Sequence, residues 1–140
     1  MIVRQFAPAD LMVIALQPHQ RSLTAEVATP EYAGELAKHG EAFTVADDSG
    51  ILAVIGLITQ WDGCARAYAF LGENASRRML HITRKVRAHL ETTTIRRIEA
   101  AVQDDFTEGH RWARMLGFKP EGWMRKYWNQ HDALLYARVL

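Results

Sequence analysis

Hydrophobic and polar residues change their spacing several times along the chain, and each change predicts a new element. Apolar residues mixed with polar ones predict an opening strand over Met1–Phe6. A short helix is expected over Ala9–Leu16 and is broken by Pro18. Further helical turns are expected over Arg21–Ala28 and Pro30–His39, the second with proline in its first turn and glycine just past its end.

A β pattern begins at residue 42. The segments Ala42–Ala46 and Ile51–Gln60 flank Asp47–Gly50, whose composition predicts a hairpin turn. The second segment is nearly all apolar, which is typical of a central strand covered on both faces. A further turn at Asp62-Gly63 leads to a strand at Cys64–Leu71, so we expect a meander of three strands.

The longest predicted helix is Ser76–Thr92, followed by a short strand at Arg96–Val102. Apolar residues recur on one side of this helix at helical spacing, and basic residues lie on the other. The expected buried residues are Met79, Ile82, Thr83, Val86 and Leu90, and the basic ones are Arg77, Arg78, Arg84, Lys85 and Arg87.

A second helix is predicted over Asp105–Leu116, with Asp105 as its cap and Glu108 completing a capping box. Its apolar face is expected to hold Trp112, Met115 and Leu116, which lie at i, i+3 and i+4. Gly117 suits the left-handed residue that ends a helix, and Phe118 is expected to return to the core.

The last two predicted strands are Lys119–Trp128 and Ala133–Leu140. The complete order β-α-α-β-β-β-α-β-α-β-β predicts a mixed α/β domain over residues 1–140. A hydrophobic fraction of 49% and a charged fraction of 24% are those of an ordinary globular domain. The formal charge of +1 gives the whole molecule no strong attraction to nucleic acid or to a membrane.

Cys64 is the only cysteine, which excludes an intrachain disulfide and a multi-cysteine zinc site. A buried strand residue is a more common role for such a cysteine than a nucleophile. The six histidines show no metal-binding spacing, so no metal is expected. No signal-peptide pattern is seen, and the longest apolar run, Ile51–Ile58, is too short to span a bilayer. We therefore expect a soluble, cytoplasmic protein.

The element order, the hairpin turn Asp47–Gly50 and a helix leading into Leu116-Gly117-Phe118 together resemble the GNAT N-acetyltransferase superfamily. Glu121-Gly122 and the closing Leu134–Val139 fit the same pattern. The resemblance covers the whole chain and implies a mostly antiparallel sheet of about six to seven strands with helices on both faces. The chain is also similar to short GNAT-like proteins of tailed bacteriophages, including an internal virion protein. That second resemblance implies a location in the host cytoplasm or the virion.

The resemblance implies that acetyl-CoA binds in a gap between the strands Cys64–Leu71 and Arg97–Val102, with its pyrophosphate at the helix N-terminus near Ser76. Arg77 and Arg78 support this implication, because the helix dipole disfavours cations in a first turn; the alternative is two solvated side chains. The implied cofactor-binding residues are Phe70, Leu71, Gly72, Asn74, Ala75, Ser76, Arg77 and Arg78.

The sequence departs from the family pattern at two places. The phosphate-binding motif Gln/Arg-x-x-Gly-x-Gly/Ala is matched here by Leu71, Asn74 and Ser76, without its glycines. Many GNAT enzymes carry a tyrosine five residues before the phenylalanine of Leu-Gly-Phe, where it protonates the leaving thiolate. This chain has Ala113 at that position.

The candidate catalytic residues are therefore other groups. Glu99 and Glu73 are candidate general bases, although an ion pair with Arg97 is an equally good interpretation of Glu99. His110 and Tyr127 are candidate acids, because histidine titrates near neutrality and a phenol can protonate a thiolate. A histidine in the first turn of a helix is more often simply exposed.

Two functions follow from these observations. The first is transfer of acetyl from acetyl-CoA to a primary amine on a small molecule or a protein. The second is a catalytically silent structural or interaction protein, with a protein partner or a second copy bound through the aromatic segment Trp123–Trp128 or the basic helix face. The same aromatic and basic residues could stack on nucleic acid. A half-buried strand would show the same alternation of aromatic and basic residues without any nucleic-acid partner.

Overall fold

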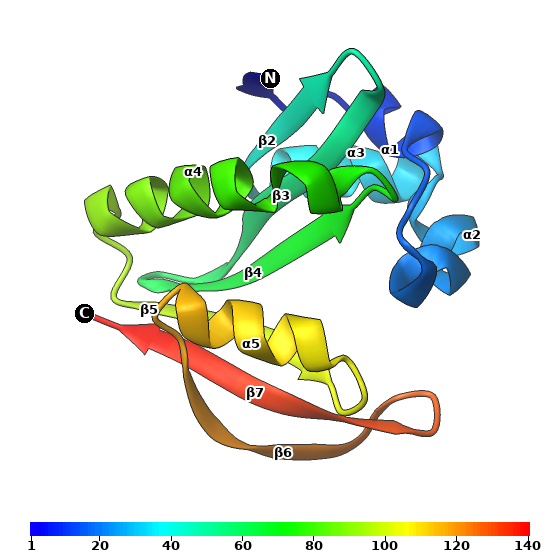
Figure 1. Ribbon diagram of the computed structural model, residues 1–140. Coiled ribbons are helices and arrows are strands. Elements are labelled where there is room, and N and C mark those ends of the chain that lie inside the picture. Colours follow the sequence, from blue (N-terminus) through cyan, green and yellow to red (C-terminus); the bar gives the residue numbers. More distant parts are fainter. The chain divides into compact units, whose positions relative to one another are not determined.

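The computed structural model describes all residues, Met1–Leu140, and contains one seven-stranded sheet with strand order β1-β2-β3-β4-β5-β7-β6 (Figure 1). The pair β4–β5 is parallel, whereas β1–β2, β2–β3, β5–β7 and β6–β7 are antiparallel. The predicted mixed, mostly antiparallel sheet is therefore confirmed. The strands are β1 (Ile2–Gln5), β2 (Gly40–Asp47), β3 (Gly50–Trp61), β4 (Cys64–Leu71), β5 (Arg97–Gln103), β6 (Lys119–Trp128) and β7 (His131–Val139).

The helices follow the predicted order, with shifted ends. The first ends at Val13 rather than Leu16, because Leu16 forms a β-bridge with Gly72. Residues 75–78 form a 3₁₀ turn, so Arg77 and Arg78 precede the long α-helix instead of opening it. No helix is both long and apolar enough to cross a membrane. The helices are α1 (Ala9–Val13), η1 (Pro18–Leu23), α2 (Thr24–Val27), α3 (Pro30–Lys38), η2 (Ala75–Arg78), α4 (Met79–Thr92) and α5 (Thr107–Met115).

The chain forms two compact units. The first consists of Met1–Thr59 and Ala67–Arg84, and so holds β1, β2, α1–α3 and the later part of β4. Its core lies where the apolar faces of α1, α2 and α3 pack against β3 and β4. The buried members of that core are Phe6, Leu11, Ile14, Leu16, Val27, Ala33, Leu36, Val54 and Phe70.

A buried carboxylate accepts several hydrogen bonds near the start of the first unit. Asp10 is 5% exposed and accepts hydrogen bonds from both terminal nitrogens of Arg4, at 2.8 and 2.7 Å. It also accepts from the Ala7 backbone N–H at 2.9 Å and from the Thr44 hydroxyl at 2.7 Å. Burial raises the pKa of Asp10, but these hydrogen bonds outweigh burial and hold it below its usual value.

The second unit consists of Gln60–Arg66 and Lys85–Leu140. Its helix α5 begins at Thr107 after Phe106, with no side-chain cap, so the predicted capping box at Asp105 is wrong. Gly117 has φ +93 and Phe118 is 5% exposed, which confirms the predicted end of the helix.

The predicted apolar face of α5 is partly wrong. Met115 is 52% exposed, and the helix instead buries Gly109 and Ala113. Gly109 lies so close to the core that an added Cβ would be 2.5 Å from the Phe106 ring.

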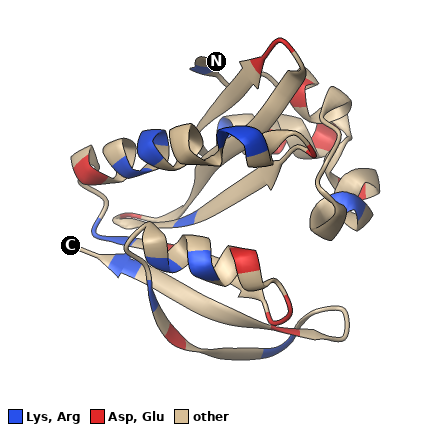
Figure 2. Ribbon diagram, in the orientation of Figure 1, with Lys and Arg blue, Asp and Glu red and all other residues tan.

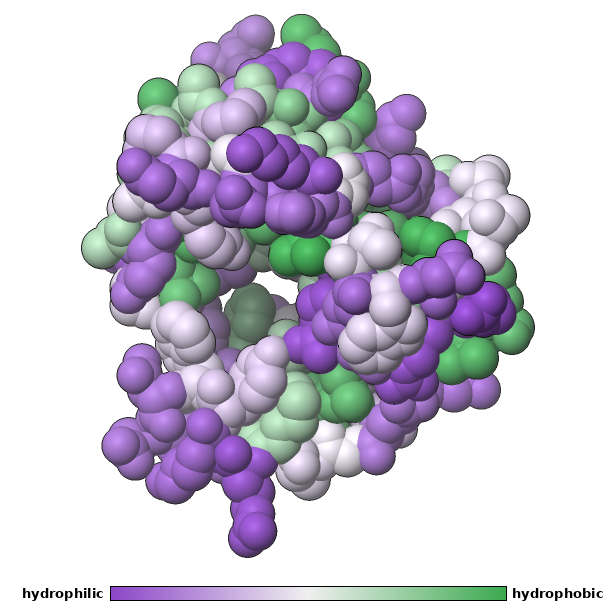
Figure 3. All heavy atoms as spheres, turned by 180° about the vertical axis from the view of Figure 1, so that it is seen from behind, coloured by the Kyte–Doolittle hydropathy of each residue, from purple (hydrophilic) through white to green (hydrophobic).

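Strand β6 forms one edge of the sheet, and only Met124 along it is partly buried. Trp123, Tyr127 and Trp128 are 58%, 47% and 42% exposed. The half-buried strand inferred from alternation is therefore wrong, because every residue of β6 except Met124 is exposed. Hydrophilic residues gather at the tip of the β6–β7 hairpin, at the lower left of Figure 3.

Candidate active site

The connection from β4 to α4 uses most of its backbone amides within the chain. Gly72 cannot loosen this loop: its N–H donates to Leu52 O at 2.7 Å, and an added Cβ would lie 2.8 Å from Ile51 O. Phe70, Leu71 and Ala75 are buried. Most of the backbone N–H groups that the resemblance assigns to the phosphate are therefore already hydrogen-bonded within the chain. The acceptors are Gln20 Oε1 for Leu71, Leu52 O for Gly72, Ala15 O for Glu73 and Gly72 O for Ala75.

The two arginines before α4 differ in their surroundings. Arg78 donates through Nε to Asp47 at 3.4 Å, so an acidic residue of the same unit accounts for its position. Arg77 is exposed on the 3₁₀ turn beside Ser76 and forms no ion pair. Basic residues recur along α4, as Figure 2 shows in blue. Of the implied phosphate-binding residues, Ser76 and Arg77 are exposed and Asn74 is half-buried.

Glu99 is held in a network of charged strand residues. Its two carboxylate oxygens accept from Arg66 Nη2 at 3.1 Å and from Arg97 Nε at 2.8 Å. Arg97 also binds both carboxylate oxygens of Glu121, and Arg66 donates through Nη1 to the Tyr127 hydroxyl at 2.7 Å. The hydrogen bond from Arg97 holds the pKa of Glu99 below its usual value, against a smaller opposing effect of burial. The ion-pair interpretation of Glu99 is confirmed, and a carboxylate so stabilised is a weak general base.

The two other candidates from strand ends keep usable groups. Tyr127 accepts from Arg66, so its own hydroxyl proton is available to another acceptor, and its side chain is 47% exposed. The Glu73 carboxylate is 54% exposed and lies 3.9 Å from Arg21 Nη2, a distance at which an exposed pair contributes little. Each residue therefore retains the chemistry for which the sequence singled it out.

His110 is not merely exposed, as its position in a first turn suggested. Its Nε2 lies 2.9 Å from Gln103 O and its Nδ1 lies 2.8 Å from the hydroxyl of Tyr136, which is fully buried. The carbonyl can only accept, so Nε2 carries a proton and, in neutral histidine, Nδ1 accepts from the tyrosine. Both ring nitrogens are therefore engaged, and protonation of a substrate by His110 would require breaking one of these bonds.

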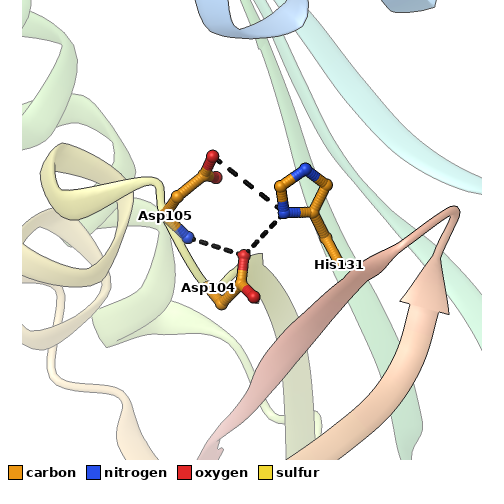
Figure 4. A group of neighbouring side chains, drawn as sticks. All are labelled: Asp104, Asp105 and His131. Atoms are coloured by element: carbon orange, nitrogen blue, oxygen red, sulfur yellow. Dashed lines mark hydrogen bonds and ion pairs between the residues drawn. The ribbon is translucent and has the colours of Figure 1, made fainter.

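Three side chains of types that can bind a metal, those of Asp104, Asp105 and His131, lie close together where β5 ends and β7 begins (Figure 4). His131 Nδ1 lies 2.9 Å from Asp104 and 4.0 Å from Asp105. Asp104 also accepts from the backbone N–H groups of Asp105 and Asp132, and the hydrogen bond from His131 lowers the pKa of Asp104. Asp104 and Asp105 both lie in the turn that follows β5. Sequence spacing could not predict that His131 joins this group, because His131 opens β7 whereas the two aspartates follow β5.

The solved structures that are similar to this chain share one fold. No protein-family model matches the chain, and no curated protein sequence is similar to it. Among solved structures, a ribosomal-protein-S5-alanine acetyltransferase from Vibrio fischeri matches with a TM-score of 0.66 and 21% identity, over 98% of this chain and 91% of that one. A probable acetyltransferase from Staphylococcus epidermidis matches with a TM-score of 0.77 and 11% identity, over 99% and 98%.

A variant of the spermidine N-acetyltransferase from Vibrio cholerae has a TM-score of 0.69 and 13% identity, over 99% of this chain and 95% of that one. These identities are too low to carry activity from one protein to another, but the similarity extends over nearly the whole of each chain. The chain therefore has the GNAT fold, the α/β fold of these acetyltransferases.

Proposed function

We propose that residues 1–140 form a single GNAT-like domain that transfers acetyl from acetyl-CoA to a primary amine. The observation that carries the proposal is that solved structures similar over almost the full chain bear the names of acetyltransferases that act on different acceptors. A shared fold does not fix function by itself. Those names share acetyl transfer, but they do not share an acceptor.

In this reaction the amine nitrogen bonds to the thioester carbonyl carbon, the C–S bond breaks, the amine loses a proton and the thiolate gains one. Glu73 is our proposed base, because its carboxylate is exposed and weakly paired. Tyr127 is our proposed acid, because its hydroxyl proton is uncommitted. Arg77 is the proposed contact for the pyrophosphate, as a cation without an ion pair just before a long helix.

The test is calorimetric titration with acetyl-CoA of the wild type, Arg77→Ala and the matched control Arg84→Ala. Arg84 is an exposed arginine on α4. A charge-assisted contact is worth about 1.5–3 kcal/mol, so Arg77→Ala should weaken binding by roughly 10- to 100-fold and Arg84→Ala should not. Absence of heat and of any thermal shift for the wild type at millimolar acetyl-CoA would refute the proposal.

A second candidate is a catalytically silent protein that uses the fold for interaction, such as a phage virion or assembly component. The exposed aromatic residues of β6, with Glu99 committed to two arginines and alanine at position 113, favour it. The two candidates are separated by measuring thiol release from acetyl-CoA with a panel of primary amines. Turnover that falls in Glu73→Gln or Tyr127→Phe supports the enzyme. A wild type without turnover, whose self-association in sedimentation velocity is abolished by Trp123→Ser, supports the second candidate.

A further inference from the structure

The segment Ala15–Gln20 covers the edge of β4 that faces away from β3. Successive amides of an extended strand point to opposite edges, and Gly72 N–H points to β3, where it donates to Leu52. Leu71 and Glu73 therefore present their backbone groups to the other edge. There the Gln17 N–H donates to Leu71 O at 2.8 Å, and the Glu73 N–H donates to Ala15 O at 2.7 Å.

Gln20 extends this cover with its side chain instead of its backbone. Its Nε2 donates to Ala69 O at 2.7 Å, and its Oε1 accepts from the Leu71 N–H at 2.8 Å. A carboxamide has the donor and acceptor of a peptide group. One residue of a parallel neighbouring strand would bond to this same carbonyl and this same N–H, on either side of Phe70. The Gln20 side chain thus takes the place of an extended amide chain on β4.

We propose that Gln20 is a displaceable plug: Ala69 O and the Leu71 N–H bind an extended ligand carrying a secondary amide, and the ligand must displace the Gln20 carboxamide. Under the proposed function, on which this inference rests, the ligand is acetyl-CoA, whose pantetheine arm is an extended chain with amide groups. The plug then lowers the affinity for acetyl-CoA and favours ligands whose amides can replace both of its hydrogen bonds.

The structure also explains how such a plug opens. Gln20 is half-buried and lies in the 3₁₀ helix η1, so rotation about its side-chain bonds withdraws the carboxamide. The backbone bonds of Ala15 and Gln17 to Glu73 and Leu71 do not pass through that side chain. Opening also breaks a longer hydrogen bond, of 3.3 Å, from Gln17 Nε2 to Gln20 Oε1. It frees the Ala69 carbonyl and the Leu71 N–H without separating η1 from β4.

The test compares acetyl-CoA binding by the wild type, Gln20→Ala and the control Gln130→Ala, using calorimetry. Gln130 is an exposed glutamine whose side chain accepts from Lys126 at 3.2 Å. Because a competitor for two hydrogen bonds is removed, Gln20→Ala should bind about tenfold more tightly, and Gln130→Ala should match the wild type. Hydrogen exchange of the Leu71 amide should be faster in free Gln20→Ala than in the free wild type, and slow again with acetyl-CoA.

The outcomes separate the two claims. If all three proteins bind acetyl-CoA with equal affinity, the plug is refuted and the proposed function stands. If none binds, the proposed function fails and the plug fails with it. A Gln20→Ala variant that keeps the wild-type unfolding temperature but binds more weakly would also overturn the plug, because it would make Gln20 a ligand contact.

Discussion

Replacing Glu99 by glutamine removes the only charge that lies between two arginines in the network of the second unit. Glutamine has nearly the same shape as glutamate, but its NH₂ group donates hydrogen bonds. That group must face a guanidinium, which can only donate as well. Arg97 keeps its pair with Glu121, whereas Arg66 keeps only the hydroxyl of Tyr127. The side chains of Glu99 and Arg66 are 12% and 24% exposed, so water compensates only in part.

Those contacts set the size of the expected effect. Hydrogen bonds to charged groups contribute about 1.5–3 kcal/mol, and one of the two arginines keeps another carboxylate, so Glu99→Gln should lower the free energy of unfolding by about 2 kcal/mol. In urea, this loss corresponds to a fall in the midpoint of roughly 1 M. The control Glu91→Gln changes an exposed residue at the end of α4 and should stay within about 0.5 kcal/mol of the wild type.

Acid provides a second measurement on the same pair of variants. The pKa of Glu99 is lowered in the folded protein, so its contribution to stability is complete above the unfolded value, near pH 4.3. That contribution is lost as the pH falls through the folded pKa. The stability difference between wild type and Glu99→Gln should therefore be constant from pH 7 to about pH 5 and should shrink below pH 4. Equal losses in Glu99→Gln and Glu91→Gln at pH 7, or a difference that grows in acid, would refute this account of the network.

Two further predictions concern packing and the first unit. Gly34 and Gly109 both lie in helices, but an added Cβ meets nothing within 4 Å at Gly34 and the Phe106 ring at 2.5 Å at Gly109. Gly34→Ala should therefore raise the thermal unfolding temperature, by about 0.5–1 kcal/mol in stability, and Gly109→Ala should lower it by about 1–3 kcal/mol; a gain in both would contradict the packing. Asp10→Asn should cost about 3 kcal/mol in urea unfolding, and the double variant with Thr44→Val should lose less than the sum of the single losses, since the two side chains share a hydrogen bond.

Local patterns in the sequence predict the parts of the fold that depend on near neighbours. The hairpin at Asp47–Gly50 follows from turn residues between two β patterns, and the Asp47 carboxylate accepts the Ser49 N–H as such turns do. The strand Cys64–Leu71 has its predicted limits, and Cys64 is buried within it. Each of these predictions uses residues that lie within a few positions of one another.

Predictions fail where a distant residue competes for a local group. The side chain of Asp105 suits the predicted helix cap, but it lies beside His131, which comes from another strand. A nearer residue, Gln103, also donates a hydrogen bond to Asp105. The same limit applies to the candidate site. Sequence spacing pairs Glu99 with Arg97, but it contains no signal for Arg66, which reaches Glu99 from β4.

The exposed edge strand β6 has a consequence for the behaviour of the protein at high concentration. An unpaired strand edge can template the addition of another chain, and this edge is rich in aromatic residues. Pro120 lacks an N–H to offer, Lys126 has φ 52 within a register shift, and Lys119, Arg125 and Lys126 charge the strand positively. These features oppose edge-to-edge pairing partly through electrostatic repulsion, which salt screens. The colloidal stability of this protein should therefore decline as ionic strength rises, although each molecule stays folded.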